Sequence, residues 1–239
     1  LLDLGSGPGT GLWAATNTFT GVACATHVEV DRSMSELARR LLAETTVGAR
    51  VQSTWQHGDV SKQSKVMPHD LALVAYLLGE VSPDARNQIV DAAWVVATGA
   101  LVIVEPGTPA GFRCVLAARS RLVEQGATII APCPHDRLCP LPDDDWCHFG
   151  VRLNRSSVHR NIKQATLAYE DEKYSYVIAV RVPRSGTEAR VIRRPQFQTG
   201  RVFIELCSTD GLARQTVSRS ERESYRLARK LHWGDVWDR

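Results

Sequence analysis

The chain has 239 residues, of which 44% are hydrophobic and 23% are charged, as is ordinary for a folded protein. This composition excludes a disordered or collagen-like chain, and the absence of an apolar run near the roughly 20 residues of a membrane-spanning helix predicts a soluble one. The formal net charge is +3, but residues 1–150 carry 11 Lys and Arg against 16 Asp and Glu, whereas residues 151–239 carry 18 against 10.

The front part of the chain alternates apolar strands with helices. The first elements expected are a strand at 1–4 (LLDL), a helix from Leu12, a strand at 27–30 (HVEV) and a helix at 33–44 with Ser33 as its cap and Met34, Leu37, Leu41 and Leu42 at helical spacing. A weak strand at 50–55, a strand at 70–78, a helix at 83–97, a strand at 100–105 and a helix at 110–125 follow. Apolar strands separated by helices predict a Rossmann-like α/β fold, with a parallel sheet covered on both faces.

The pattern changes after Gly126. Residues 132–149 are rich in Pro, Asp and Cys and predict a loop, followed by strands at 174–182, around Val191 and at 201–207 and by a basic helix at 220–233. We therefore expect three segments: a core at 1–131, a cysteine-rich loop at 132–150, and a stretch at 151–239 that ends the sheet and adds a small, basic, β-rich extension. Because the chain begins inside a strand, we expect the natural protein to have more sequence in front.

A glycine-rich turn joins the first strand to the first helix. The segment LDLGSGPGTG places five candidate cofactor-binding residues there: Asp3, Gly5, Ser6, Gly7 and Gly9. Glycines allow a sharp turn with a ligand against the backbone. The nicotinamide-dinucleotide fingerprint needs a third glycine where this chain has Thr10, and no Walker lysine follows. The segment instead resembles the first motif of class I S-adenosylmethionine-dependent methyltransferases, whose cofactor has no phosphate.

Two more acidic residues follow the next strands. Asp31 lies 22 residues beyond Gly9, where a carboxylate for the ribose hydroxyls is expected. Asp59, in HGDV, resembles the acidic residue that faces the adenine amine in such methyltransferases. The alternative for each is a turn or helix-capping aspartate. We expect both to bind the cofactor.

Four cysteines stand apart from Cys24 and Cys114, which lie in apolar surroundings. Three fall within fifteen residues of the proline-rich loop and one follows sixty residues later: Cys133, Cys139, Cys147 and Cys207. They can form two disulfides or one four-thiolate metal site, and a cytosolic context favours the metal. Spacings of six and eight match neither zinc ribbons nor ferredoxins, so spacing does not choose the metal.

Two histidines adjoin these cysteines. His135 and His148 are candidates to replace a thiolate in a zinc site, or to act as hydrogen-bond donors around a four-thiolate site. We favour the second role, since four thiols suffice. The metal site would then clip the loop to the C-terminal extension and close a long loop that otherwise costs entropy.

One family combines these motifs. The chain resembles the methyltransferase-like proteins that associate with the small subunit of mitochondrial ribosomes, and their bacterial relatives, in LDLGSGPGTGLWAA, VEVDRS, VIVEPGTPAGF, APCPHDRLCPLPDDDWCHF, YEDEKYSYV and ELCSTDG. The resemblance implies S-adenosylmethionine binding, a 4Fe-4S cluster on the four cysteines, and a role in small-subunit assembly or translation. It implies a cytoplasmic location in a bacterium or the mitochondrial matrix in a eukaryote, and we favour a bacterial source.

The residues leave catalysis open. No D/N-P-P-Y/F tetrapeptide follows the fourth strand, where AYLLGEV stands, and no catalytic centre is visible. Ala131-Pro132-Cys133 resembles the Pro-Cys motif of RNA cytosine-5 methyltransferases, but that motif follows the fourth strand and this one follows the fifth helix. The alternatives to a binding protein are an active methyltransferase of rRNA or ribosomal protein, and a zinc-containing RNA-binding protein with a degenerate cofactor pocket.

The basic C-terminal third suggests a surface for a polyanion. Arginine supplies 24 of the 29 cations, and its planar guanidinium group suits phosphate. The candidate rRNA contacts are Arg193, Arg194, Arg219, Arg222, Arg226 and Arg229. A solvated basic face is the alternative. We expect neither DNA nor a membrane as a partner.

Overall fold

The computed structural model describes residues 1–60, 67–184 and 189–238. They form two compact units. The described parts of 1–105, with 114–131 and 176–184, make the first unit, and 106–113, 132–175 and 189–238 make the second. The three expected segments stay a prediction about domains.

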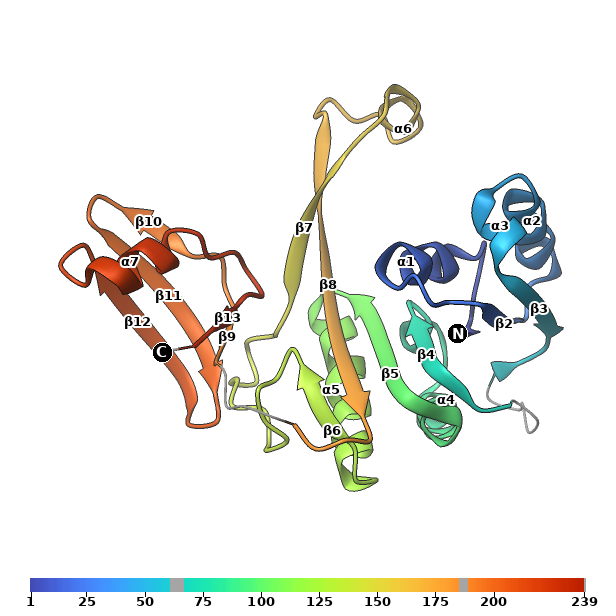
Figure 1. The fold of residues 1–239 in the computed structure, drawn as a ribbon, viewed down its shortest axis with the longest axis horizontal. Coiled ribbons are helices and arrows are strands. Elements are labelled where there is room, and N and C mark those ends of the chain that lie inside the picture. The colour runs from blue at the N-terminus through green and yellow to red at the C-terminus, as the bar shows by residue number, and fades with distance from the viewer. Residues whose placement is uncertain (61–66, 185–188, 239) are drawn as a thin grey trace. The chain divides into compact units, whose positions relative to one another are not determined.

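A mixed sheet forms the centre of the first unit. Its strands are β1 (Leu2–Leu4), β2 (Cys24–Glu29), β3 (Gln52–His57), β4 (His69–Ala75), β5 (Ala97–Pro106), β6 (Thr128–Ala131) and the C-terminal part of β8 (Tyr169–Val180). The order is β3-β2-β1-β4-β5-β8-β6 (Figure 1). The pairs from β3 to β5 are parallel, and β6 is antiparallel to β8. This arrangement confirms the expected Rossmann-like methyltransferase sheet, and the order reverses between β1 and β4, where such folds bind ligands.

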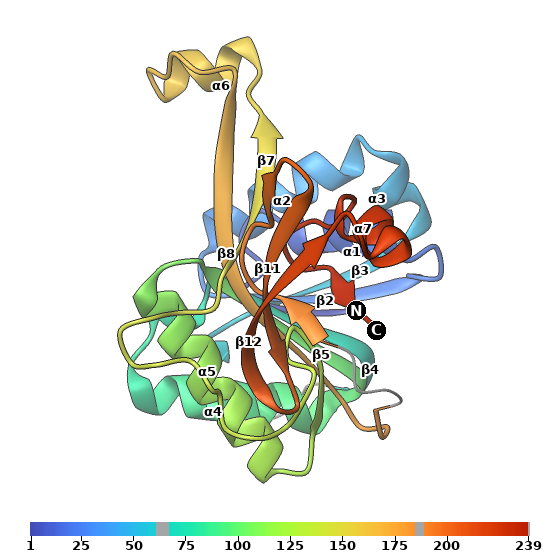
Figure 2. The same cartoon turned by 90° about the vertical axis from the view of Figure 1, so that its left-hand side faces the viewer.

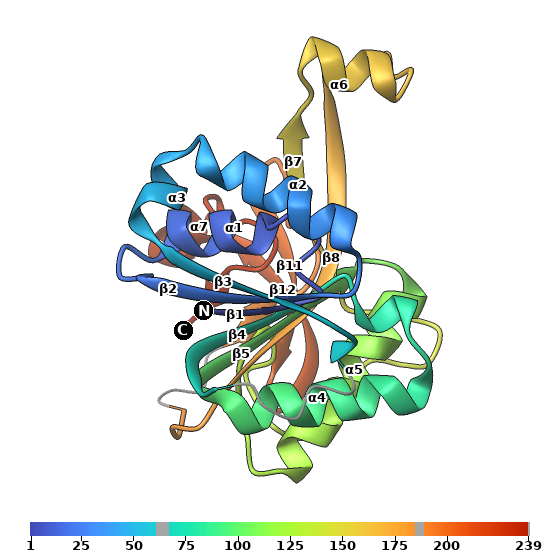
Figure 3. The ribbon, with the colours of Figure 1, turned by 90° about the vertical axis from the view of Figure 1, so that its right-hand side faces the viewer.

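Helices cover both faces of this sheet. Figure 3 shows α1 (Thr10–Thr18), α2 (Arg32–Ala43) and α3 (Thr46–Arg50) on one face, and α4 (Pro83–Val96) and α5 (Pro109–Glu124) on the other. A short helix, η2 (Leu78–Glu80), follows β4. One buried cluster under α1 and α2 consists of Leu1, Leu12, Ala15, Ala25, Leu42 and Val51. Within the described ranges, none of the helices is both long and apolar enough to cross a membrane.

The expected start and buried face of α2 were wrong in detail. Asp31, not Ser33, is the N-cap, because its carboxylate accepts the amides of Ser33 and Met34. The helix buries Ala38 and Leu42, while the apolar side chains at 34, 37 and 41 stay about 40% exposed. Apolar spacing marks a stripe but does not tell which edge of it faces the sheet.

A second, antiparallel sheet lies in the second unit. Its strands are β9 (Ala189–Val191), β10 (Gln196–Gln198), β11 (Arg201–Ser208), β12 (Gly211–Ser218) and β13 (Val236–Trp237). The order is β10-β11-β9-β13, and β12 pairs with β11. Helix α7 (Arg222–Ala228), shorter than the helix expected at 220–233, packs on β11 and β12 (Figures 1 and 2). The β-rich C-terminal extension is therefore confirmed.

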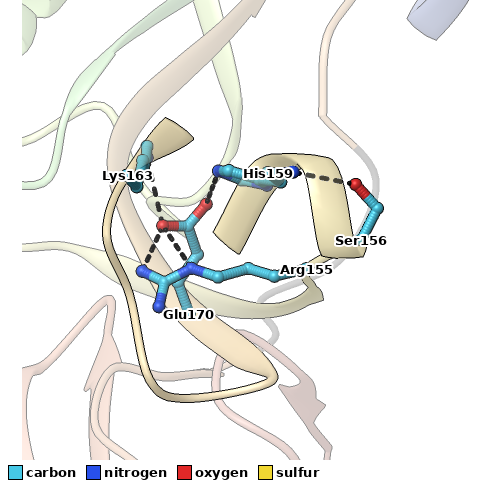
Figure 4. A network of polar contacts seen from close by, with 5 residues as sticks. All are labelled: Arg155, Ser156, His159, Lys163 and Glu170. Carbon is cyan, nitrogen blue, oxygen red and sulfur yellow. Dashed lines mark hydrogen bonds and ion pairs between the residues drawn. The ribbon is translucent and has the colours of Figure 1, made fainter. Parts of the chain in front are cut away.

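The second unit also holds a long hairpin. Strand β7 (Phe149–Asn154) pairs with the N-terminal part of β8, and α6 (Ser157–Ile162) forms the connection between them (Figure 1). The Glu170 carboxylate accepts hydrogen bonds from Arg155 Nη2 at 2.7 Å and from Lys163 Nζ at 3.1 Å. His159 Nε2 lies 3.3 Å from the same carboxylate (Figure 4). The hydrogen bond from Arg155, followed by that from Lys163, lowers the pKa of Glu170. One carboxylate thus fixes the connection to β8.

Candidate functional site

The glycine turn needs glycine for its conformation. Gly5, Gly7 and Gly9 have φ angles of +70°, +50° and +83°, which L side chains rarely adopt. The amides of Gly5 and Ser6 donate to the carbonyl of Val28, with N···O distances of 2.9 and 3.2 Å. The turn between β1 and α1 is therefore tied to β2.

A cavity of about 660 Å³ opens above this turn, within the usual range of small-molecule sites. Of the seven predicted cofactor-binding residues, six line it: Asp3, Gly5, Ser6, Gly7, Asp31 and Asp59. The seventh, Gly9, is the N-cap of α1, where no side chain makes the capping hydrogen bond. The structure thus brings together Asp3 of β1 and the acidic residues that follow β2 and β3, Asp31 and Asp59.

The cavity is acidic. Five carboxylate residues line it: Asp3, Glu29, Asp31, Asp59 and Glu80. Among the described residues, no Lys, Arg or His joins them in the lining. Such a field attracts a cation and repels a nucleotide phosphate. A sulfonium cofactor without phosphate therefore fits the cavity better than a dinucleotide does.

Two buried oxygen atoms in this cavity lack a hydrogen-bond partner among the described residues. Asp3 and Ser6 are both buried, and Oδ2 of Asp3 and Oγ of Ser6 make no hydrogen bond with the described residues. The nearest cation candidate for Asp3 is His27, whose Nδ1 is 3.8 Å from Oδ2, too far for a hydrogen bond. Buried polar atoms in folded proteins are nearly always paired, so these oxygens suit a ligand with hydrogen-bond donors.

Glu29 is a cavity residue that the sequence analysis missed. Its side chain is buried, its Oε2 accepts the amide of Gly7 at 2.7 Å, and its Oε1 accepts the amide of Asp31 at 2.8 Å. One carboxylate therefore joins the glycine turn to the end of β2. The available signal was the alternation in VEVD, which places Glu29 and Asp31 two residues apart on one side of the chain.

Asp31 has two roles in the structure. Its Oδ1 accepts the amide of Ser33 at 2.8 Å and the hydroxyl of Ser33 at 2.7 Å. The side-chain hydrogen bond from Ser33 is the main reason that the pKa of Asp31 lies below its ordinary value. The residue caps α2 and lines the cavity as well, so the capping alternative and the cofactor-binding prediction are compatible.

One side of the cavity is formed by the segment AYLLGEV, residues 75–81, which Glu105 holds through hydrogen bonds. This buried carboxylate accepts the amides of Leu78 at 2.7 Å and Gly79 at 3.2 Å. Burial raises the pKa of Glu105, and the two amides oppose that rise. Tyr76, with φ of +55°, belongs to the same segment and also lines the cavity. The segment AYLLGEV thus forms a wall of the cavity, held by Glu105, at the place where amino-directed methyltransferases carry their tetrapeptide.

The cysteine-rich loop has no helix or strand from 132 to 148 and is held by side chains of the second unit. Arg193 donates to both carboxylate oxygens of Asp145 at 2.6 and 2.5 Å. Further hydrogen bonds join Arg190 to the carbonyl of Pro132, Arg137 to that of Thr209, Trp146 to that of Gly107 and Ser175 to that of Cys147. Fixed points along the loop hold it in place without regular secondary structure.

The four candidate ligands are not joined in disulfides, and the other three lie near Cys147. Burial raises the pKa of Cys147, and the nearby thiols of Cys133, Cys139 and Cys207 raise it further, while Arg193 opposes them. No three His, Cys, Asp or Glu side chains in the described part of the chain come close enough to hold a single metal ion. Thiolates are the ligands of iron-sulfur clusters, so the donor chemistry of this set suits such a cluster.

The two histidines differ in their surroundings. His135 is buried, and its Nε2 lies 3.6 Å from Sγ of Cys207. His148 stacks on Trp146 and meets the edge of Trp233, and burial lowers its pKa. His135 is placed to donate to a ligand sulfur, whereas His148 belongs to an aromatic stack.

The candidate RNA-contacting arginines also divide into two kinds. Arg193 is not free for a partner, because it pairs with Asp145 and donates to the carbonyl of Ile192. The remaining candidates are exposed at Arg194, Arg219, Arg222, Arg226 and Arg229. Arg193 is half-buried and already paired, which a count of cations cannot reveal, and its contact with RNA stays a prediction.

The solved structures that this chain is similar to include two methyltransferases. Magnesium protoporphyrin IX methyltransferase of Synechocystis, solved with S-adenosylmethionine, is 14% identical with a TM-score of 0.49, covering 76% of this chain and 69% of that one. Precorrin-6y C5,15-methyltransferase of Geobacter metallireducens is 13% identical with a TM-score of 0.49, covering 76% and 78%.

Curated relatives match nearly the whole sequence. The ribosome assembly protein METTL17, mitochondrial, of Homo sapiens is 31% identical over 99% of this chain and 54% of its own length. The Rsm22-cox11 tandem protein 2, mitochondrial, of Schizosaccharomyces pombe is 24% identical over 99% and 38%. The chain therefore spans about half or less of these relatives. A family model described as mitochondrial small ribosomal subunit Rsm22 matches residues 1–238, and this chain belongs to the Rsm22 family.

Proposed function

We propose that this chain is a methyltransferase-like protein that binds S-adenosylmethionine and a 4Fe-4S cluster, binds the small ribosomal subunit and assists its assembly or translation. The observation that carries the proposal is the family match over residues 1–238. The acidic cavity, the thiols around Cys147 and the exposed arginines supply a physical basis for each part.

The cavity residues suit the three parts of S-adenosylmethionine. The unpaired oxygens of Asp3 and Ser6 would accept hydrogen bonds from the ammonium of the amino-acid part. Asp31 would accept hydrogen bonds from the ribose hydroxyls, and Asp59 would accept one from the adenine amine. Glu29 holds the turn and the end of β2 in register for this binding. The surrounding carboxylates stabilise the positive sulfonium.

The cluster would be held by Cys133, Cys139, Cys147 and Cys207. A bound 4Fe-4S cluster supplies one-electron redox chemistry and a rigid link between its ligands. Here Cys207 is the penultimate residue of β11 and the other three lie in the 132–148 loop, so the ligands would join two segments that are sixty residues apart in sequence. Arg193 and Arg190 position the loop for this link.

Exposed arginines would bind rRNA phosphates, since guanidinium groups match phosphate geometry.

The names of the curated relatives describe mitochondrial proteins. They favour the mitochondrial matrix over the bacterial location preferred from the sequence. The alternative is an active methyltransferase of rRNA or ribosomal protein, and the segment AYLLGEV carries no recognised catalytic motif for it.

Three measurements on the chain purified without oxygen test the proposal. Iron near four per chain with a broad brown absorbance is expected, and a colourless protein with one zinc would reject the cluster. Calorimetry should show S-adenosylmethionine binding that Asp3→Asn weakens. Co-sedimentation with small ribosomal subunits should fall with rising salt, and salt-insensitive binding would count against the phosphate contacts. Labelled cofactor with immature subunits tests the methyltransferase alternative, and label in RNA or protein would establish it.

A further inference from the structure

A groove in the second unit has a composition different from that of the cofactor cavity. Its volume is about 1010 Å³, and it runs between the turn joining β10 to β11 and helix α7. Arg201, Arg219 and Arg229 line it together with Phe197 and Tyr225. The elements come from one sheet and the helix packed on it (Figure 1).

The cations of this groove are available to a ligand. Among the residues that the structure describes, no Asp or Glu lines the groove. Arg201, Arg219 and Arg229 are exposed and form no ion pair within the described residues. By contrast, Arg152 and Arg193 are each paired with an aspartate. The groove therefore concentrates uncompensated positive charge.

An exposed aromatic ring lies among these cations. Phe197 pairs with Val202 across β10 and β11, and Val202 pairs with Val217 across β11 and β12. Both valines are buried in the core of this sheet, but Phe197 is 56% exposed. Directly opposite residues share one face of a sheet, so Phe197 extends the apolar face beyond the part that α7 covers. Its uncovered ring offers a flat surface to a ligand.

We propose that this groove binds a single-stranded segment of RNA, with a base stacked on Phe197 and the neighbouring phosphates on Arg201, Arg219 and Arg229. Aromatic platforms with backbone-binding cations are the general solution for single strands, whereas bases in a duplex are not available for stacking. An acidic peptide would satisfy the arginines but would leave the ring unused. The inference rests on the proposed RNA partner and adds its conformation and its site.

The test uses the whole chain and fluorescently labelled ten-nucleotide RNA of mixed sequence, followed by anisotropy over a range of salt. Phe197→Ala should lower affinity on the order of tenfold at every salt concentration, because stacking is not a charge effect. Phe197→Trp should retain binding. Arg219→Gln should reduce the slope of log affinity against log salt by about 0.7, the value for one phosphate of a single strand. A blunt duplex of the same sequence should bind more weakly.

Matched controls share exposure but lie outside the groove. Phe19→Ala removes a ring that is 53% exposed in the first unit, and Arg214→Gln removes an exposed arginine of β12. Neither should change affinity by more than about twofold. Circular dichroism and thermal melting report whether Phe197→Ala keeps the fold, and Phe197→Leu provides an apolar, non-stacking variant.

The outcomes separate the groove from the proposed function. If the unmodified chain binds ribosomal subunits but binds the single strand no better than the duplex, the groove assignment is overturned and the subunit role stands. If Arg222→Gln weakens RNA binding while the Phe197 and Arg219 variants do not, RNA binds elsewhere on the protein. If the chain binds neither RNA nor subunits, both proposals fail.

Discussion

Replacing Gly11 by alanine tests whether close packing holds the Asp3 carboxylate in the cavity. A Cβ on Gly11 would lie 2.6 Å from Oδ2 of Asp3 and 2.6 Å from Cδ2 of Leu73. Ordinary contact begins near 3.4 Å, so the helix or the carboxylate must move by about 0.8 Å. Alanine in a helix gains about 1 kcal/mol over glycine, and overpacking costs about 1–3 kcal/mol. We expect Gly11→Ala to lower the free energy of unfolding by about 0–2 kcal/mol.

The larger effect should be on cofactor binding. Asp3 is buried beside His27, so displacement of its carboxylate takes Oδ2 away from the ammonium it would bind. Losing a hydrogen bond to a charged group costs about 1.5–3 kcal/mol, or roughly tenfold or more in affinity. Calorimetry with S-adenosylmethionine and chemical denaturation measure both effects, with Gly21→Ala as control because its Cβ would meet no atom within 4 Å. A Gly11→Ala protein that is about 1 kcal/mol more stable, with unchanged affinity, would refute this reasoning.

Three further predictions concern the second unit. Cys207→Ser should lower both iron content and melting temperature, since removing one ligand uncouples the cluster from folding; unchanged values would contradict the ligand assignment. In protein prepared without metal, Cys147 should alkylate more slowly at pH 8 than the exposed Cys24, because burial and neighbouring thiols raise its pKa; mass spectrometry showing equal rates would oppose this. The lowered pKa of Glu170 means that its stabilisation of α6 is present above its ordinary value of 4.5 and is lost as pH falls through the lower folded value. Hydrogen exchange in α6 should then rise in acid, and Glu170→Gln should remove that dependence.

Burial explains which strands could be predicted from the sequence. Strands β1, β4 and β5 contain apolar runs because helices cover both faces of their sheet. Strand β7 buries only Phe149, and β12 buries only Val217. These two strands form by pairing with β8 and β11, and hydrogen bonding to a neighbour leaves no periodicity in a strand's own sequence.

The candidate site divides in a similar way. Motif spacing was enough to place Asp3 and Asp31 at one cavity, because they lie at the C-terminal ends of neighbouring parallel strands, which meet at the same edge of a sheet. The contact of Glu29 with Gly7 spans 22 residues and depends on the exact path of the turn. Gly9 belongs to the same motif but caps a helix, since its left-handed conformation starts α1. A motif therefore predicts the location of a site better than the role of each residue in it.

The arginines of this chain have two roles that the net charge does not distinguish: some bond to groups within the protein, and others are available to a partner. Arg121, Arg152, Arg155 and Arg193 neutralise carboxylates, and Arg86, Arg137, Arg181 and Arg190 donate to backbone carbonyls. Guanidinium groups suit this internal work because their several donors satisfy acceptors in segments without regular structure, as in the cysteine-rich loop. What remains for a polyanion is a smaller set of unpaired arginines, and three of these line one groove beside an exposed ring. The excess of cations after residue 150 thus stabilises an irregular scaffold as well as facing a partner.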